Sequence, residues 1–112
     1  RIDWRAPAAA IDRLVRAATP WPTAYTEWRG RSLKLWVTSY EDRNHRASGE
    51  LGEVLSASPE SLVVATGEGR LRIHELQLAG RRRMTVGELL AGHDVRVGDI
   101  LGGGTWNVES GK

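Results

Sequence analysis

Cysteine is absent from this chain of 112 residues, which excludes disulfides and thiolate-bound metals. Stability must therefore come from a packed core, and a cytoplasmic location is expected. No apolar run approaches the roughly 18 residues of a membrane span, and the first residues do not resemble a signal peptide, so no membrane partner is expected. The chain also lacks an initiator methionine, and we expect it to be a piece of a longer protein.

Lysine is scarce as well: Lys34 and Lys112 are the only lysines among 16 basic residues. The formal net charge is only +2, yet the isoelectric point is near 9.5. Because arginine binds phosphate bidentately and stacks on bases, the arginine bias favours a nucleic-acid partner. A GC-rich coding sequence is the alternative explanation.

The composition is that of a single globular domain. Apolar residues make up 40% of the chain and charged residues 27%, whereas a disordered chain would have fewer apolar residues and a larger net charge. The length suffices for one domain and not for two.

Helical periodicity marks the first segment. After Pro7, helical spacing predicts an apolar face and leaves Asp12 among the polar positions; that face consists of Ile11, Leu14, Val15 and Ala18. The helix must end before Pro20, where Pro20-Trp21-Pro22 predicts a stiff extended corner, with Trp21 as its anchor. Trp4 is expected to dock the first segment.

From residue 24 the period changes to two, which predicts a series of short strands. They cover residues 24–28, 31–40, 53–56, 62–66, 70–78 and 95–101, with a polar loop at 41–50. In the second strand Leu33, Leu35 and Val37 are expected on one face and Lys34, Trp36 and Thr38 on the other. A bulge near His74 or Glu75 would reconcile a change of parity in the fifth strand. Thr85 and Glu88 predict a capping box for a short helix that ends at Gly92.

These elements predict a mainly β fold: a small Greek-key open barrel resembling an oligonucleotide-binding fold, with an N-terminal helix and one short internal helix. We expect residues 1–22 to form that helix and the Pro-Trp-Pro corner, residues 23–102 the barrel, and residues 103–112 a flexible tail.

Residues that could carry out a reaction are not apparent. His45, His74 and His93 each lack a second ligand within four residues, so neither a metal site nor a catalytic residue is expected. Gly67-Glu68-Gly69 is better explained by a hairpin than by a phosphate loop, because no Lys-Ser/Thr pair or helix follows it.

Basic residues provide a candidate surface instead. Arg81, Arg82 and Arg83 follow a strand and would repel one another unless a polyanion or carboxylates lie opposite them; a solvated turn is the alternative. Outward-facing cations on one sheet would form a surface that tracks phosphates, and Trp36 is the candidate for base stacking. The remaining candidates for this surface are Arg29, Arg31, Lys34 and Arg72.

Several sequence blocks, in order, resemble the C-terminal part of the methionyl-tRNA formyltransferase family over about residues 1–102. They include Ile2-Asp3-Trp4, Pro20-Trp21-Pro22, Leu33-Lys34-Leu35-Trp36, Gly52-Glu53-Val54-Leu55, Val64-Ala65-Thr66-Gly67-Glu68-Gly69 and Gly80-Arg81-Arg82-Arg83-Met84. The chain departs from the family at Thr23, where the family often has glycine.

The resemblance implies a barrel that helps to hold initiator tRNA through phosphate contacts. It also implies an N-terminal formyltransferase domain in the same full-length chain. That domain would bind 10-formyltetrahydrofolate and carry the catalytic residues, so this chain would need no cofactor and would be a non-catalytic fragment of the enzyme. The alternative is a structural subdomain of a formyltransferase that acts on a nucleotide-sugar or a carrier-bound aminoacyl group.

Overall fold

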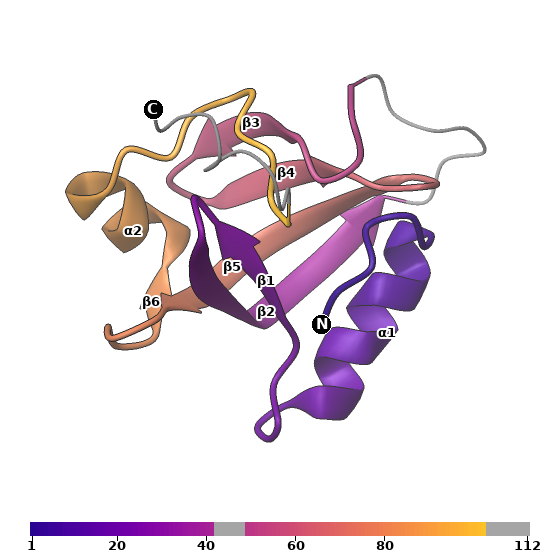
Figure 1. The fold of residues 1–112 in the computed structure, drawn as a ribbon, viewed down its shortest axis with the longest axis horizontal. Coiled ribbons are helices and arrows are strands. Elements are labelled where there is room, and N and C mark those ends of the chain that lie inside the picture. Colours follow the sequence, from indigo (N-terminus) through magenta and orange to yellow (C-terminus); the bar gives the residue numbers. More distant parts are fainter. Residues whose placement is uncertain (42–48, 103–112) are drawn as a thin grey trace.

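The computed structural model describes residues 1–41 and 49–102, and in these residues one antiparallel sheet is flanked by two helices (Figure 1). In chain order the elements are α1 (Ala8–Ala18), β1 (Tyr25–Trp28), β2 (Arg31–Glu41), β3 (Val54–Ser58), β4 (Ser61–Ala65), β5 (Arg70–Leu78), β6 (Met84–Thr85) and α2 (Val86–Gly92). The strand order is β1-β2-β5-β4-β3, with β6 paired to β5. The predicted mainly β, open architecture with a leading helix and a short internal helix is confirmed.

The gap between the edge strands β1 and β3 is spanned by the backbone of residues 99–102. The amide of Gly102 donates to the carbonyl of Glu27 (2.8 Å), and the amide of Val54 donates to the carbonyl of Asp99 (2.8 Å). The prediction of a strand over residues 95–101 is wrong: backbone hydrogen bonds join residues 98–101 to Gly52 and Val54, but in the described residues this pairing amounts to one isolated β-bridge, between Glu53 and Ile100. The segment crosses from one edge strand to the other, so it pairs a few backbone groups of each edge without running alongside either strand.

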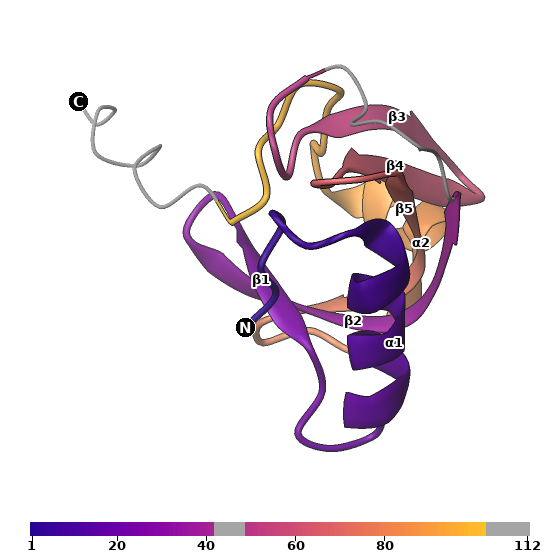
Figure 2. The same cartoon turned by 90° about the vertical axis from the view of Figure 1, so that its right-hand side faces the viewer.

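Helix α1 packs against β2 and β5, and Figure 2 shows it running alongside the sheet. Ile11 and Val15 are buried as predicted, but Leu14 is 42% exposed and Asp12 only 3% exposed. The expectation for these two residues is corrected because Thr38 of β2 presents a hydroxyl to the helix, and its Oγ1 donates to Asp12 Oδ1 at 2.5 Å. Because the sheet offers this hydrogen-bond donor, the helix faces the sheet with Asp12 and leaves Leu14 in solvent.

Strands β2 and β5 are irregular where they pair most extensively. Leu35 faces Leu76, Val37 faces Glu75, and Thr38 faces Ile73, so Trp36 and His74 are each an extra residue in their strand. The predicted bulge near His74 is confirmed. The irregularity reverses the parity of β2, so Val37 is 37% exposed and Thr38 is buried, the opposite of the prediction.

The corner between α1 and β1 exposes Trp21, contrary to the prediction that this residue anchors it. Trp21 is 83% exposed, whereas Thr23 is buried with its amide bonded to the carbonyl of Ala18 (2.8 Å). Thr23 has a φ of 76°, the left-handed region that favours glycine. The amide of Thr23 and its hydroxyl, which donates to the carbonyl of Pro20 (2.7 Å), hold the corner, and the indole of Trp21 is left in solvent.

The core is formed by residues from the N-terminal segment, the strands and both helices. Trp4 docks the first segment as predicted: it is 6% exposed, and its Nε1 donates to Thr26 Oγ1 at 3.0 Å. Leu35, Leu71, Ile73 and Leu76 are fully buried at the centre of the sheet. Within the described part of the chain, no helix is both long and apolar enough to cross a membrane.

The predicted capping box at α2 is confirmed. Thr85 Oγ1 accepts from the amide of Glu88 (3.2 Å), and the amide of Thr85 donates to Glu88 Oε1 (2.9 Å). We expect Thr85→Ala to lower the free energy of unfolding by about 1 kcal/mol, because it removes the acceptor of the Glu88 amide. Urea unfolding followed by circular dichroism measures this, and Thr85→Ser, which keeps the hydroxyl, should restore most of the loss. If Thr85→Ala and Thr85→Ser were equally stable, the hydroxyl of Thr85 would not contribute to stability as a cap.

Candidate nucleic-acid interface

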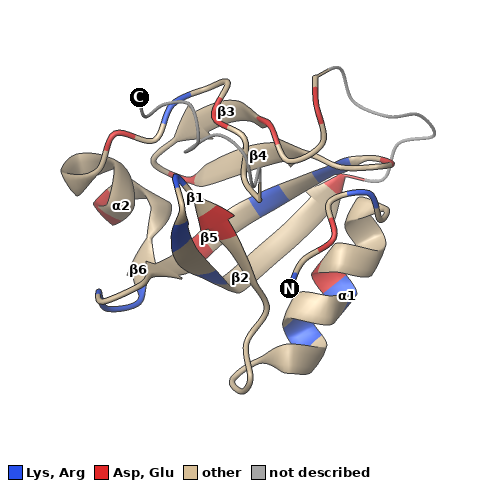
Figure 3. Ribbon diagram, in the orientation of Figure 1, with Lys and Arg blue, Asp and Glu red and all other residues tan. Residues whose placement is uncertain are grey.

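Of the predicted basic residues, Lys34 lines a groove, while Arg81 lines the neighbouring hollow together with Arg82 and Glu88. Arg31, Lys34 and Arg81 are exposed, and none of them has a carboxylate partner among residues 1–41 and 49–102. The groove has a volume of about 230 Å³ and is lined by Ser32, Lys34, Gln77, Leu78, Ala79 and Gly80. Arg31 and Arg81 each adjoin a lining residue in sequence. Figure 3 shows the corresponding basic segments, at the start of β2 and in the turn before β6, on the same side of the molecule.

Backbone pairing brings these segments together. The amide of Ala79 donates to the carbonyl of Ser32 at 2.9 Å, and Lys34 pairs with Gln77 across β2 and β5. Because Leu33 and Leu35 fill the core, Lys34 must project from the opposite, outward face. We call Arg31, Lys34 and Arg81 the cation group; all three are exposed on neighbouring segments, and none is paired with a carboxylate in the described residues. Arg31 has the strand parity of Leu33, so it is exposed as the first residue of β2 and not as a neighbour of Lys34 on the outward face.

Arg82 and Arg83 lie next to the cation group but are neutralised by carboxylates. Arg82 Nη2 is 3.3 Å from Glu88 Oε2, and Arg83 Nη2 is 2.8 Å from Glu75 Oε1. The backbone amide of Thr85 and then the guanidinium of Arg82 hold the pKa of Glu88 below its ordinary value. Two of the three consecutive arginines thus have carboxylates of this chain opposite them, and Arg81 has none in the described residues. Such exposed ion pairs contribute little to stability.

Trp36 lies beside the cation group, under Arg83. The guanidinium carbon of Arg83 is 4.8 Å from the centroid of the indole ring, and Trp36 Nε1 donates to Gln77 Oε1 at 3.0 Å. Gln77 Nε2 in turn donates to the carbonyl of Arg81 at 2.9 Å. Sequence reasoning missed Gln77, although its place between the inward-facing Leu76 and Leu78 marks it as outward-facing.

Arg29 and Arg72 lie apart from the cation group. Arg29 covers the ring of Trp28 (4.8 Å to the centroid) and pairs with Asp99 at 3.3 Å. Arg72 pairs with Glu41 and faces Ser39, which is roughly 17 Å along β2 from Lys34. The structure therefore does not place these two predicted residues in one surface with the others.

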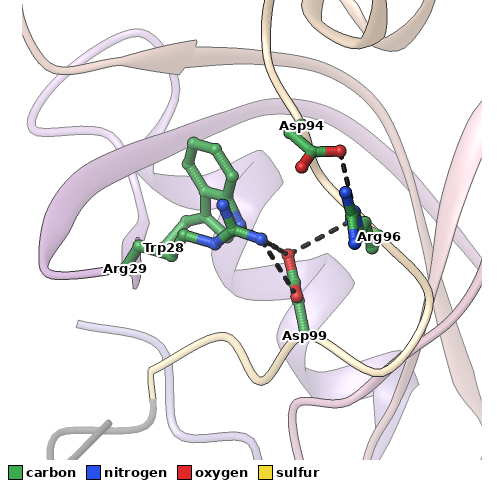
Figure 4. A network of polar contacts seen from close by, with 5 residues as sticks. All are labelled: Trp28, Arg29, Asp94, Arg96 and Asp99. Atoms are coloured by element: carbon green, nitrogen blue, oxygen red, sulfur yellow. Dashed lines mark hydrogen bonds and ion pairs between the residues drawn. The ribbon is translucent and has the colours of Figure 1, made fainter. Parts of the chain in front are cut away.

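Arg29 belongs instead to a polar network that fastens the segment after α2 (Figure 4). Asp99 accepts from Trp28 Nε1 (2.9 Å), from Arg29 and from the amide of Arg96 (3.1 Å). Arg96 also pairs with Asp94 at 2.9 Å, and its guanidinium lowers the pKa of the Asp94 carboxyl. Each arginine of this network is paired with a carboxylate, and the network holds residues 94–99 against β1.

No catalytic constellation is found in the described residues. His74 contacts Ser39 Oγ (2.8 Å) and the carbonyl of Glu60 (3.2 Å), and His93 packs edge-on against Trp28 with centroids 6.2 Å apart. Within residues 1–41 and 49–102, no three histidine, cysteine, aspartate or glutamate side chains are grouped so that they could hold a metal ion. His45 and the tail, residues 103–112, lie outside the described residues.

Fold and surface together define a small, mainly β domain with exposed cations. The chain belongs to the family described as "Formyl transferase, C-terminal domain", whose model matches residues 1–94. The resemblance given by the sequence blocks is thereby confirmed.

The matched relatives are much longer than this chain. It is 44% identical over 103 residues to the methionyl-tRNA formyltransferase of Magnetococcus marinus, covering 92% of this chain and 32% of the relative. It is 41% identical over 102 residues to the methionyl-tRNA formyltransferase of Acetivibrio thermocellus, covering 90% and 32%. The chain thus spans about a third of the length of these relatives.

Solved structures show the same fold. HypX from Aquifex aeolicus in complex with tetrahydrofolic acid superposes with a TM-score of 0.63 at 22% identity, over 80% of this chain and 16% of that protein. A variant of the same HypX superposes with a TM-score of 0.64 over 88% of this chain and 20% of that protein. The likeness to HypX concerns the fold.

Proposed function

We propose that this chain is the tRNA-binding C-terminal domain of a methionyl-tRNA formyltransferase, and that it holds initiator tRNA through phosphate contacts. The observation that carries the proposal is the cation group, Arg31, Lys34 and Arg81, which is exposed on segments joined by backbone pairing and has no carboxylate partners in the described residues. Exposed cations without partners attract a polyanion, and releasing the counterions of the polyanion supplies the affinity.

The catalytic work belongs to the rest of the full-length protein. Relatives named methionyl-tRNA formyltransferase are about three times as long as this chain, which leaves room for an upstream catalytic domain. In this proposal that domain binds 10-formyltetrahydrofolate and transfers the formyl group. The present domain has no cofactor of its own, acts in the cytoplasm and positions the tRNA. Phosphate contacts fix orientation and do not read sequence, so selection of the initiator tRNA rests elsewhere.

How much each predicted cation contributes to the affinity for tRNA should depend on whether it is already paired with a carboxylate. Arg81 and Lys34 meet a phosphate without losing another partner, whereas Arg82 and Arg83 must first release Glu88 and Glu75. Arg29 and Arg72 must release Asp99 and Glu41 in the same way, and they lie away from the groove. We therefore expect Arg81 and Lys34 to contribute more to the affinity than Arg82, Arg83, Arg29 or Arg72.

The test is binding of fluorescently labelled initiator tRNA, measured by anisotropy over a series of salt concentrations. We expect log affinity to fall linearly with log salt, and Arg81→Gln and Lys34→Gln each to reduce the slope by about 1. Arg82→Gln should reduce the slope by less. Arg13→Gln is the matched control, because Arg13 is an exposed arginine on α1 outside the groove.

Two outcomes would overturn the proposal. If the folded domain does not bind tRNA at low salt, the structural-subdomain alternative stands, in which the barrel shapes an interface within a formyltransferase. If Arg13→Gln lowers the slope as much as Arg81→Gln does, binding is a property of the overall charge and not of the cation group.

A further inference from the structure

Trp36 is held in place by polar contacts although it lies outside the buried core cluster. Trp4 and Trp28 belong to the buried core, but Trp36 is half-buried on the outward face and takes no part in that cluster. Its indole is fixed by Gln77 through Nε1 and by Arg83 over the ring, while Arg83 is itself held by Glu75. A large apolar ring that is immobilised outside the core is preorganised for contact with a ligand.

The ring also borders a second groove. This groove, of about 320 Å³, lies between the C-terminal half of α1 and the bulge of β2, and Val15, Arg16, Thr19, Trp36, Val37 and Thr38 line it. Val37 is 37% exposed in its wall because the bulge turns it out of the core. The groove thus combines an aromatic wall, an aliphatic wall and the guanidinium of Arg16, which is paired with Asp12.

We propose that an unpaired nucleobase of the bound RNA enters this second groove and stacks against Trp36. The inference rests on the proposed function, because the phosphates gripped by the cation group bring the base within reach. Bases stack on aromatic side chains without regard to sequence, and a neighbouring cation strengthens the contact.

Continuity between the two grooves favours RNA as the occupant. Lys34, which lines the first groove, lies two residues before Trp36, which is roughly 7 Å along β2. Gln77 lines the first groove and holds the indole of Trp36, so a single side chain connects the two sites. Arg83 over the ring and Arg16 in the groove are each paired with a carboxylate, Glu75 and Asp12, so they offer guanidinium hydrogen-bond donors to a base more than net positive charge.

The test compares two RNA probes that carry the same phosphates: a single-stranded pentauridylate and the same pentamer without bases. We expect the wild-type protein to bind the base-containing probe about 5-fold to 150-fold more tightly, as one stacked base contributes. Trp36→Leu should bring this ratio close to one and leave the salt dependence for the abasic probe unchanged. Trp36→Phe should retain part of the ratio.

Trp21→Leu is the matched control, because Trp21 is 83% exposed and lies outside the groove. It should leave the ratio unchanged. If Trp36→Leu fails to fold, Val37→Gln, at a position already in contact with solvent, fills the groove with a polar side chain and should lower the ratio as well.

The outcomes separate this inference from the proposed function. Binding of neither probe at low salt would overturn the proposed function. Equal binding of both probes by the wild-type protein would overturn the stacking alone and leave the second groove for a protein contact. A base preference that survives in folded Trp36→Leu and Val37→Gln would overturn the assignment to Trp36.

Discussion

Gly67→Ala is expected to lower the free energy of unfolding by roughly 3 kcal/mol or more, which is large for adding a single methyl group. A Cβ at Gly67 would lie 1.8 Å from the carbonyl oxygen of Arg5 and 2.7 Å from its carbonyl carbon. Both atoms are backbone, so no rotation of a side chain relieves the overlap. The variant must therefore separate two chain segments that are in direct contact.

The same contact holds the start of the chain on the sheet. The amide of Gly67 donates to the carbonyls of Trp4 (3.0 Å) and Ala6 (3.1 Å), and the amide of Ala8 donates to the carbonyl of Glu68 (2.8 Å). Moving the segment away breaks these bonds and exposes Trp4, which is only 6% exposed. Loss of the hydrogen bonds and of the burial adds to the steric cost.

Urea unfolding monitored by tryptophan fluorescence measures the effect of Gly67→Ala. Gly92→Ala is the control, since a Cβ at Gly92 meets no atom within 4 Å and its φ is not positive. We expect that control to be neutral or slightly stabilising, as alanine restricts the unfolded chain. If Gly67→Ala were as stable as Gly92→Ala, the N-terminal segment would not be docked as the structure shows.

Thr38→Val should have the second-largest effect, a loss of about 3 kcal/mol. The Oγ1 of Thr38 donates to the buried carboxylate of Asp12, whose other oxygen is 2.8 Å from Arg16 Nε. Valine has nearly the same shape as threonine but no hydroxyl, so one oxygen of a carboxylate that is 3% exposed loses its donor. Leaving a buried charge partly unpaired costs more than losing an ordinary hydrogen bond.

A double-mutant cycle tests that explanation. Asp12→Leu combined with Thr38→Val should cost less than the sum of the two single changes, because removing the charge abolishes the need for a donor. Thr19→Val is the control: its hydroxyl donates to the neutral carbonyl of Val15 at 2.7 Å, and its loss should cost about 1 kcal/mol or less. Strict additivity of Asp12→Leu and Thr38→Val would show that the hydroxyl and the carboxylate are not coupled.

The cation group illustrates how far sequence reasoning reaches. The alternation of apolar Leu33 and Leu35 with Lys34 is enough to predict that Lys34 faces outward. The partners of Arg82 and Arg83 depend on how the turn before β6 folds back on Glu75 and Glu88. The sequence contains these carboxylates, but which arginine each of them neutralises is a matter of distance in space.

Helix α1 illustrates the same division. Its bounds agree with its apolar spacing and with Pro20, yet the exposed Leu14 and the buried Asp12 were assigned to the wrong environments. The bulge at Trp36 and His74 sets which residues of β2 face the helix, and it puts the hydroxyl of Thr38 opposite Asp12. A bulge adds one residue to the count along a strand, so every side chain beyond it changes face.

The sequence by itself determined the helices, most strands, the cap of α2, the outward position of Lys34 and membership of the formyl transferase C-terminal family. These features follow from residues that lie within a few positions of one another, where backbone geometry fixes the period. Only the tertiary structure decided which cations lack a carboxylate, that Gln77 holds Trp36, and that residues 99–102 join the two sheet edges. Those outcomes depend on cross-strand register and on contacts between distant segments, where one bulge or one turn changes which side chains meet.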